Sequence, residues 1–317
     1  MQTADLFLIK GAGLIQNEEL RTYIALNAAI IFWGLSFVAT KIALESIPLF
    51  TLVFARFSLA SCFLLVFLIR RGFPEFTGKD HVNMFLIALF EPGLYFIFET
   101  LGLKYTTAPK ASLIIATIPV VVMIFSALFL GEKTRITGFL GIGLSLTGIA
   151  VLITGDPQFK WDLGGSMLGD ILIIGAVISA ALYIINARKL GQNRSPFEIT
   201  SMQFMYGAIF YAPAFFWELP HMQWSAVSGR SIGALIYLTF FATVSAFLCY
   251  NFSLSRVPAT RAAVFINGIP VVTTLGAWML LGEKLTMIQA AGGCIVLFAV
   301  FLTNLPGVLM SPQKFDS

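Results

Sequence analysis

Apolar residues run along this chain in long unbroken stretches separated by short polar turns, without the alternation that marks strands. A transmembrane helix needs about 20 consecutive apolar residues to cross a hydrocarbon core of roughly 30 Å. The pattern therefore predicts an all-α membrane protein with ten transmembrane helices. The predicted spans are residues 23–44, 49–68, 82–101, 108–130, 136–153, 165–185, 199–217, 232–254, 259–281 and 287–305.

Composition excludes several classes of protein. Of the 317 residues, 58% are hydrophobic and 11% are charged, against about 45–50% and about 25% in soluble domains. The net charge of +4 comes from basic residues that stand singly in loops, so no nucleic acid partner is predicted. The three cysteines lack CxxC spacing, so neither a disulfide nor a metal site is predicted from them. The two histidines lie in separate loops and predict no metal site either. The sequence contains no nucleophile or nucleotide-binding motif, and we predict no catalytic residue and no cofactor.

The distribution of Lys and Arg predicts the orientation, because cytoplasmic loops collect positive charge. With the N-terminus inside, thirteen basic residues lie on the inner side, five on the outer side, and Lys41 and Arg56 within spans. Both termini are therefore predicted to be cytoplasmic, in a multi-pass protein of the cell (inner) membrane. The tails are residues 1–22 and 306–317.

The chain contains an internal repeat. Residues 105–133 and 256–284 share 11 identities in 29 positions, including Pro119 with Pro270 and Gly131-Glu132-Lys133 with Gly282-Glu283-Lys284. Because five spans separate the two copies, their ends lie on opposite sides of the membrane. We predict two inverted five-helix repeats, residues 23–154 and 165–305. Such repeats suit alternating access, and gene duplication without it is the alternative.

These motifs resemble a known family. Trp33-Gly34-x-Ser36-Phe37-x-x-x-Lys41, Arg56 in the second span, and the paired Pro-Val and Leu-Gly-Glu-Lys blocks are similar to the EamA family of the drug/metabolite transporter superfamily. The resemblance covers residues 23–305. It implies ten helices in two inverted halves around a central cavity, and transport of small metabolites, often amino acids, frequently outward.

Ionisable residues inside a bilayer are functional candidates because an uncompensated charge there is costly. Glu91, Tyr95 and Glu99 are spaced to share one face of the third span, and Pro92-Gly93 interrupts its helical hydrogen bonding. We expect this face to line the cavity, or else Glu91 to be a structural carboxylate bonded to a neighbouring helix. A carboxylate beside a cavity can also bind and release a proton, which makes protons a candidate partner.

Two cations lie at matching depths. Arg56 is predicted to reach Glu91, and Lys41 to lie level with Glu99, so two ion pairs are hypothesised. Lys41 near a helix end can instead extend to the membrane interface without a partner.

The remaining candidates are less charged. Ser36, Trp33 and Asn267 are predicted to add polar groups and an aromatic wall to the substrate site, with simple packing as the alternative for Trp33. Pro119 and Pro270 lie in mid-span at equivalent positions and are predicted hinges, or else fixed kinks.

The predicted function is a secondary transporter of small metabolites such as amino acids, and the resemblance to the EamA family implies that it is an exporter. A carboxylate and a cation in one cavity suit a zwitterion. A phosphorylated or nucleotide-linked sugar antiporter is the alternative, although it calls for more basic groups. A receptor or an intramembrane enzyme is a remote alternative. The sequence makes no prediction of the oligomeric state.

Overall fold

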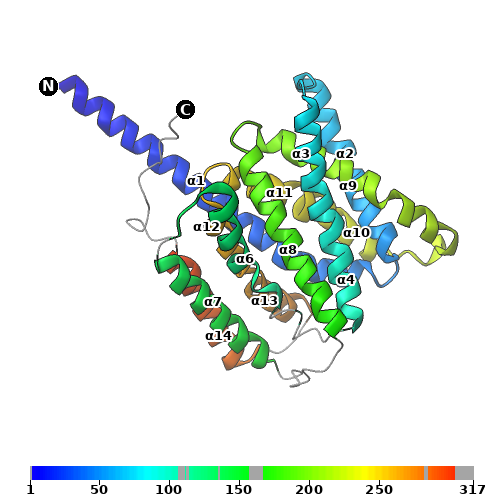
Figure 1. The fold of residues 1–317 in the computed structure, drawn as a ribbon. Coiled ribbons are helices and arrows are strands. Elements are labelled where there is room, and N and C mark those ends of the chain that lie inside the picture. The colour runs from blue at the N-terminus through cyan, green and yellow to red at the C-terminus, as the bar shows by residue number, and fades with distance from the viewer. Residues whose placement is uncertain are drawn as a thin grey trace.

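The computed structural model describes residues 2–105, 111, 114–134, 136–156, 167–281 and 285–303, and all regular structure within these ranges is helical (Figure 1). The helices are α1 (Gln2–Ala43), α2 (Leu49–Arg71), α3 (Gly78–Ala88), η1 (Leu89–Leu94), α4 (Tyr95–Tyr105), α6 (Ile118–Phe125), η2 (Ser126–Leu130), α7 (Ile136–Thr154), α8 (Met167–Leu190), α9 (Pro196–Glu218), η3 (Leu219–His221), η4 (Trp224–Ala226), α10 (Gly229–Tyr237), η5 (Leu238–Ser245), α11 (Ala246–Leu254), α12 (Ala259–Ile266), α13 (Ile269–Leu281) and α14 (Met287–Thr303).

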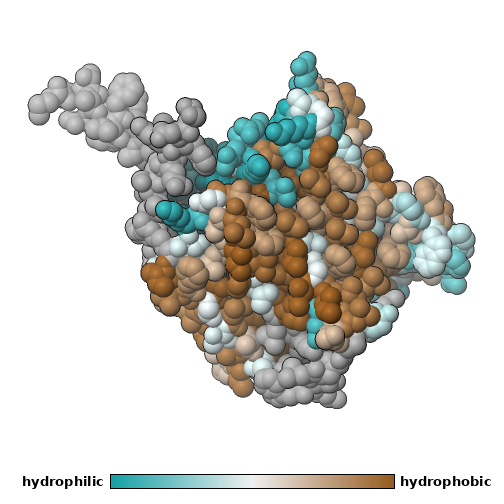
Figure 2. Space-filling model, viewed as in Figure 1, coloured by the Kyte–Doolittle hydropathy of each residue, from teal (hydrophilic) through white to brown (hydrophobic). Residues whose placement is uncertain are grey.

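Seven helical stretches in the described ranges are long and apolar enough to cross a membrane. They are Glu18–Ala43, Leu49–Arg71, Gly78–Gly102, Ile136–Thr154, Met167–Leu190, Gly229–Leu254 and Ala259–Leu280, and shorter apolar helices cover Ile118–Leu130 and Met287–Thr303. Hydrophobic side chains cover the middle of the visible face, and hydrophilic ones gather at the top and at one edge (Figure 2). The chain is an integral multi-pass membrane protein.

Observed bounds differ from the predicted spans mainly at the N-terminus, where α1 begins at Gln2 instead of residue 23. The second predicted span, residues 49–68, is extended by one turn to Arg71 in α2. Part of the fourth predicted span, including Lys110, lies outside the described residues, as do Gly282-Glu283-Lys284 of the repeated block.

Short polar signals set several helix ends. Thr77 and Asp80 form a reciprocal capping box at the start of α3, and Ser195 and Glu198 form another at the start of α9. Gly131 ends η2 with φ 65°, a left-handed conformation that glycine adopts without strain. Turns between spans are therefore encoded locally.

The helices pack into two groups. In the first helix group, α1 contacts α10, η5, α11, α12 and α13; in the second helix group, α8 contacts α3, η1, α4 and α6. α2 packs along α9 between the groups, and α7 packs along α14 at one edge of the molecule (Figure 1).

Contacts in one half are repeated in the other. α2 and α9 are both 23 residues long, and their first residues, Leu49 and Pro196, are 147 positions apart. In the first helix group, α1 packs against α10, α11 and α13. In the second helix group, α8 makes the corresponding contacts with α3, α4 and α6. This exchangeable pattern fits a two-half repeat.

Candidate functional site

A cavity of about 480 Å³ lies between the two helix groups. Its lining comes from α1, α2, η1, α4, α6, α8, α11, α12 and α13, and it is mostly apolar and aromatic. Arg56, Glu91 and Glu99 are the charged residues in this lining. A mostly apolar pocket with a few converging polar groups is the usual form of a small-molecule site.

The cavity opens toward the turn between α1 and α2. Near that turn, the lining residues Phe37 and Leu44 are 52% and 42% exposed. At the opposite end, Tyr183 and Tyr250 are 3% and 0% exposed. We call the first the open end and the second the closed end.

The third span is interrupted at Glu91. This residue has φ −142° and ψ 111°, an extended conformation inside η1, and Pro92 follows it. Proline lacks the N–H that a continuous helix needs, so the prediction that Pro92-Gly93 interrupts the hydrogen bonding is confirmed. The interruption frees backbone carbonyls at the depth of the cavity.

Side chains of α9 satisfy these carbonyls. Gln203 Nε2 donates to the Glu91 carbonyl at 2.8 Å, and the Tyr211 hydroxyl lies 3.1 and 3.0 Å from the carbonyls of Pro92 and Gly93. A Cβ added to Gly207 would lie 3.0 Å from Pro92 Cγ, so glycine there permits the close approach of α9. A bilayer offers no water for free carbonyls, so α9 stabilises the interruption.

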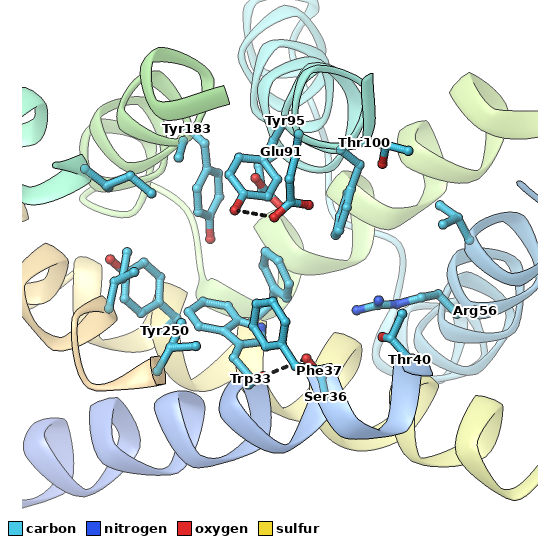
Figure 3. Close-up of a pocket in the computed structure, with 18 of the residues that line it drawn as sticks. Trp33, Ser36, Phe37, Thr40, Arg56, Glu91, Tyr95, Thr100, Tyr183 and Tyr250 are labelled. Atoms are coloured by element: carbon cyan, nitrogen blue, oxygen red, sulfur yellow. Dashed lines mark hydrogen bonds between the residues drawn. The ribbon is translucent and has the colours of Figure 1, made fainter. Parts of the chain in front are cut away.

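Acidic residues form one wall of the cavity. Glu91 is 8% exposed and lines the cavity together with Tyr95 and Glu99, which brings the three predicted residues together. The Tyr95 hydroxyl donates to Glu99 Oε1 at 3.3 Å (Figure 3). Among the described side chains, none donates a hydrogen bond to the Glu91 carboxylate, so it remains available to a bound molecule.

Arg56 lies across the cavity from this wall (Figure 3). Its Nε donates to Thr243 Oγ1 at 2.7 Å, and its guanidinium lies 5.3 Å from the ring centre of Phe57 and 6.0 Å from that of Phe96. The hypothesised Glu91–Arg56 ion pair is absent from the described residues, because Thr243 and the two rings hold the guanidinium on the α2 side. Both charged groups therefore face the cavity separately.

Residues of α1 form another wall. Trp33 Nε1 donates to the Ala242 carbonyl at 3.0 Å, and the indole packs 5.0 Å from the ring of Phe247 and 5.0 Å from that of Tyr250. Ser36 lines the cavity and donates to the Trp33 carbonyl at 2.7 Å (Figure 3). Trp33 is thus both a packed residue and a cavity wall.

Two predicted site residues lie elsewhere. Asn267 is 2% exposed and donates through Nδ2 to Ser145 Oγ at 2.8 Å. It does not line the cavity, whereas its neighbours Ile266 and Ile269 do. Lys41 is exposed near the end of α1 and does not line the cavity. Glu99 is bonded to Tyr95 in place of the hypothesised Lys41.

The predicted hinge prolines occupy equivalent places in two interrupted helices. Pro119 is the second residue of α6, after a turn at Ala116 and Thr117. Pro270 is the second residue of α13, after a turn at Asn267 and Gly268. Each proline begins a new helical segment, where its missing N–H costs little.

Sequence reasoning missed the polar residues that bracket the site. Gln203 and Tyr211 bond carbonyls of the irregular segment η1, Thr243 of η5 accepts from Arg56, and Tyr183 and Tyr250 line the closed end. The signal that could have identified them is an uncharged polar group inside an apolar span.

Fold and cavity together define a polytopic membrane protein with a central cavity. The model of the EamA-like transporter family matches residues 20–154 and again residues 167–305. The chain belongs to the EamA-like transporter family.

Relatives agree with this assignment, and a solved structure shares the fold. The uncharacterized transporter YetK of Bacillus subtilis is 27% identical over 94% of this chain and 91% of its own length. An uncharacterized transporter of Archaeoglobus fulgidus is 30% identical over 90% of this chain and 97% of its own. A crystal structure of another protein superposes with a TM-score of 0.74 at 18% identity, covering 90% of this chain and 98% of that one, which shows the fold alone.

Proposed function

We propose that this protein is a secondary transporter that exports small metabolites, amino acids or closely related compounds, by alternating access through the central cavity. The observation that carries the proposal is the separate placement of the Glu91 carboxylate and the Arg56 guanidinium on facing walls. These groups suit the ammonium and carboxylate ends of a zwitterion. The surrounding rings of Trp33 and Tyr250 suit its apolar side chain.

For the topology, we propose ten crossings in two inverted five-helix repeats, residues 23–154 and 165–305, with the tails 1–22 and 306–317 in the cytoplasm. The double match of the family model and the exchangeable helix contacts support this arrangement. In the cell (inner) membrane, this orientation puts the turn between α1 and α2 outside. The described conformation is then open to the outside.

Protons are the proposed coupling ion. Glu91 and Glu99 are carboxylates in the cavity wall, and such groups can exchange protons with each side in turn when the protein alternates. The alternative cargo, a phosphorylated or nucleotide-linked sugar, would meet Arg56 as the one cation in the described lining, so we do not adopt it.

Counterflow in proteoliposomes tests the proposal. Labelled amino acids and labelled sugar phosphates are offered to vesicles preloaded with the same unlabelled solute, with and without a pH gradient, and empty vesicles serve as the control. We expect amino-acid counterflow that the gradient accelerates. Exchange of sugar phosphates alone would contradict the proposed cargo, and the absence of any exchange would contradict transport of these solutes.

A further inference from the structure

The closed end of the cavity is joined by hydrogen bonds between the two helix groups. Arg188 is near the end of α8 in the second helix group, and its Nη1 donates to the Leu254 carbonyl at the end of α11 in the first, at 2.8 Å. Glu132 follows η2, which packs on α6 and α8 of the second helix group. Its Oε2 accepts from the N–H of Ala259, the first residue of α12 in the first group, at 2.9 Å. Both bonds therefore cross from one group to the other.

Glu132 and Arg188 also bond each other. Arg188 Nε lies 3.1 Å from Glu132 Oε1, and the two side chains are 15% and 17% exposed. Each carboxylate oxygen of Glu132 thus has its own donor, one in each helix group. The pair orients both side chains for the bonds that cross between the groups, and its low exposure strengthens them relative to surface pairs.

Two hydrogen bonds between uncharged side chains also cross between the helix groups, nearer the cavity. We call the line of these bonds and those of Glu132 and Arg188 the seam. Ser126 and Thr260 share a hydrogen bond of 3.0 Å between η2 and α12. The Tyr183 hydroxyl donates to Asn251 Oδ1 at 3.0 Å between α8 and α11. Tyr183 lines the cavity, and Arg188 lies five residues further along the same helix, about 7.5 Å at the helical rise of 1.5 Å per residue. The closed end is therefore a thin barrier.

Sequence and backbone place Glu132 at this seam. Gly131 adopts the left-handed conformation, and the Glu132 N–H returns to the Ser126 carbonyl at 3.2 Å, so the chain turns back after η2. The next residue, Lys133, is exposed. In the first copy of the Gly-Glu-Lys block, Glu132 therefore lies in the seam and Lys133 lies outside it.

We propose that Glu132 and Arg188 form the gate that closes the cavity at one side of the membrane, and that their bonds to Ala259 and Leu254 break when the cavity opens there. This inference rests on the proposed alternating access. A movement that separates the two helix groups at this end must break the four hydrogen bonds that cross between them, two from Glu132 and Arg188 and two from the uncharged side chains. It must also rehydrate the Glu132 carboxylate and the Arg188 guanidinium. The gate therefore favours the conformation that is open at the other end.

Cysteine accessibility tests the gate without any solute. In a variant with Cys62, Cys249 and Cys294 replaced by alanine, one reporter is Ala187→Cys, whose parent residue is 1% exposed on α8 beside the gate. A second reporter is Thr40→Cys in the cavity lining near the open end. Both are labelled in sealed vesicles with a membrane-impermeant maleimide from each side in turn.

We expect Glu132→Ala and Arg188→Gln to raise labelling of the Ala187→Cys reporter from the closed side by roughly three- to tenfold, because charge-assisted bonds that hold the closed state are lost. Labelling of the Thr40→Cys reporter from the opposite side should fall. The milder Glu132→Gln should have a smaller effect, since its amide oxygen can still accept from Ala259. Lys133→Ala, at the exposed neighbour, is the matched control and should change neither reporter.

Unchanged labelling in folded Glu132→Ala and Arg188→Gln variants would overturn the gate. If Glu132→Gln and Arg188→Lys both failed to give a monodisperse protein in detergent, the pair would be a folding element and the proposal would also be overturned. Counterflow of amino acids is measured separately on the same variants. Its absence in the unmodified protein would contradict the proposed cargo while leaving the labelling result to decide the gate.

Discussion

Phe57 and Phe204 stack with their ring centres 5.4 Å apart and their planes 18° apart, and each is the ninth residue of its 23-residue helix. Equivalent positions of α2 and α9 thus meet each other directly. Two residues related by a two-fold axis can touch only near that axis, so in the proposed inverted repeat the ring pair lies at the axis that relates the two halves.

The residues just before this pair are equivalent too. Arg56 bonds Thr243 in η5, and Gln203 bonds the carbonyl of Glu91 in η1. Each therefore holds the irregular helical segment of the opposite half. Of these two equivalent residues, Arg56 is charged and lines the cavity, whereas Gln203 is uncharged, so the repeated helices form an asymmetric site.

Loss of one ring of the pair should destabilise the bundle. Phe204 is fully buried, and Phe204→Ala should lower the free energy of unfolding by about 3 kcal/mol through lost packing and a residual void. Denaturation in mixed micelles measures this change. Phe139→Ala on α7, where the side chain is 51% exposed, is the control and should have a much smaller effect. Equal losses in the two variants would contradict the central role of the ring pair.

The interruption at Glu91 should depend on the Tyr211 hydroxyl. Tyr211→Phe removes the side-chain donor that the carbonyls of Pro92 and Gly93 share and should cost about 1–3 kcal/mol of stability. A lowered thermal midpoint in detergent checks this prediction. Tyr105→Phe, at an exposed position, should leave the midpoint unchanged.

Arg56 should recognise the anionic end of the cargo. Arg56→Gln should weaken binding of an amino acid by about tenfold, the effect of losing about 1.4 kcal/mol, and should leave binding of the matching amine without a carboxylate nearly unchanged. Equilibrium binding of both compounds measures the difference. Thr243→Val, which removes only the Nε partner, should have a smaller effect on the amino acid. A parallel loss for both compounds would mean that Arg56 acts through structure alone.

Much of the fold follows from the sequence because a lipid environment requires long apolar helices with internally satisfied backbones. The interruption at Pro92-Gly93 was predictable, since proline lacks an N–H. The irregular segment η5, Leu238–Ser245, contains neither proline nor glycine, and only its equivalence to η1 points to it. Local pattern therefore identifies one irregular segment of the pair and misses the other.

Side-chain partners were harder to predict than depth. Matching depths placed Arg56 and Glu91 in one cavity but could not reveal that Thr243, 187 residues away in sequence, takes the Arg56 Nε. Asn267 was expected in the cavity because it is polar. Its side-chain amide instead donates to Ser145 of α7. Helical periodicity gives the face of a residue within a few tens of degrees and does not identify the neighbouring helix.

Pro119 and Pro270 should affect the rate of transport more than binding. Each begins a helical segment after a turn, so alanine would allow the two segments to join into a stiffer helix. Pro119→Ala and Pro270→Ala should slow counterflow by roughly threefold while leaving equilibrium binding of the cargo unchanged. Paired measurements of counterflow and binding check this. An equal loss of binding would assign the prolines to packing of the site.

The most direct test of the central site is counterflow of an amino acid by the Glu91→Gln variant in proteoliposomes. The substitution keeps the shape of the side chain and removes its charge, and we expect a loss of about tenfold or more, because a charge-assisted bond to an ammonium group contributes about 1.5–3 kcal/mol. Glu45→Gln, at an exposed position in the turn between α1 and α2, is the matched control and should transport normally. If Glu91→Gln, folded and inserted, exchanges the amino acid at the unmodified rate, the assignment of the cavity as the transport site is contradicted.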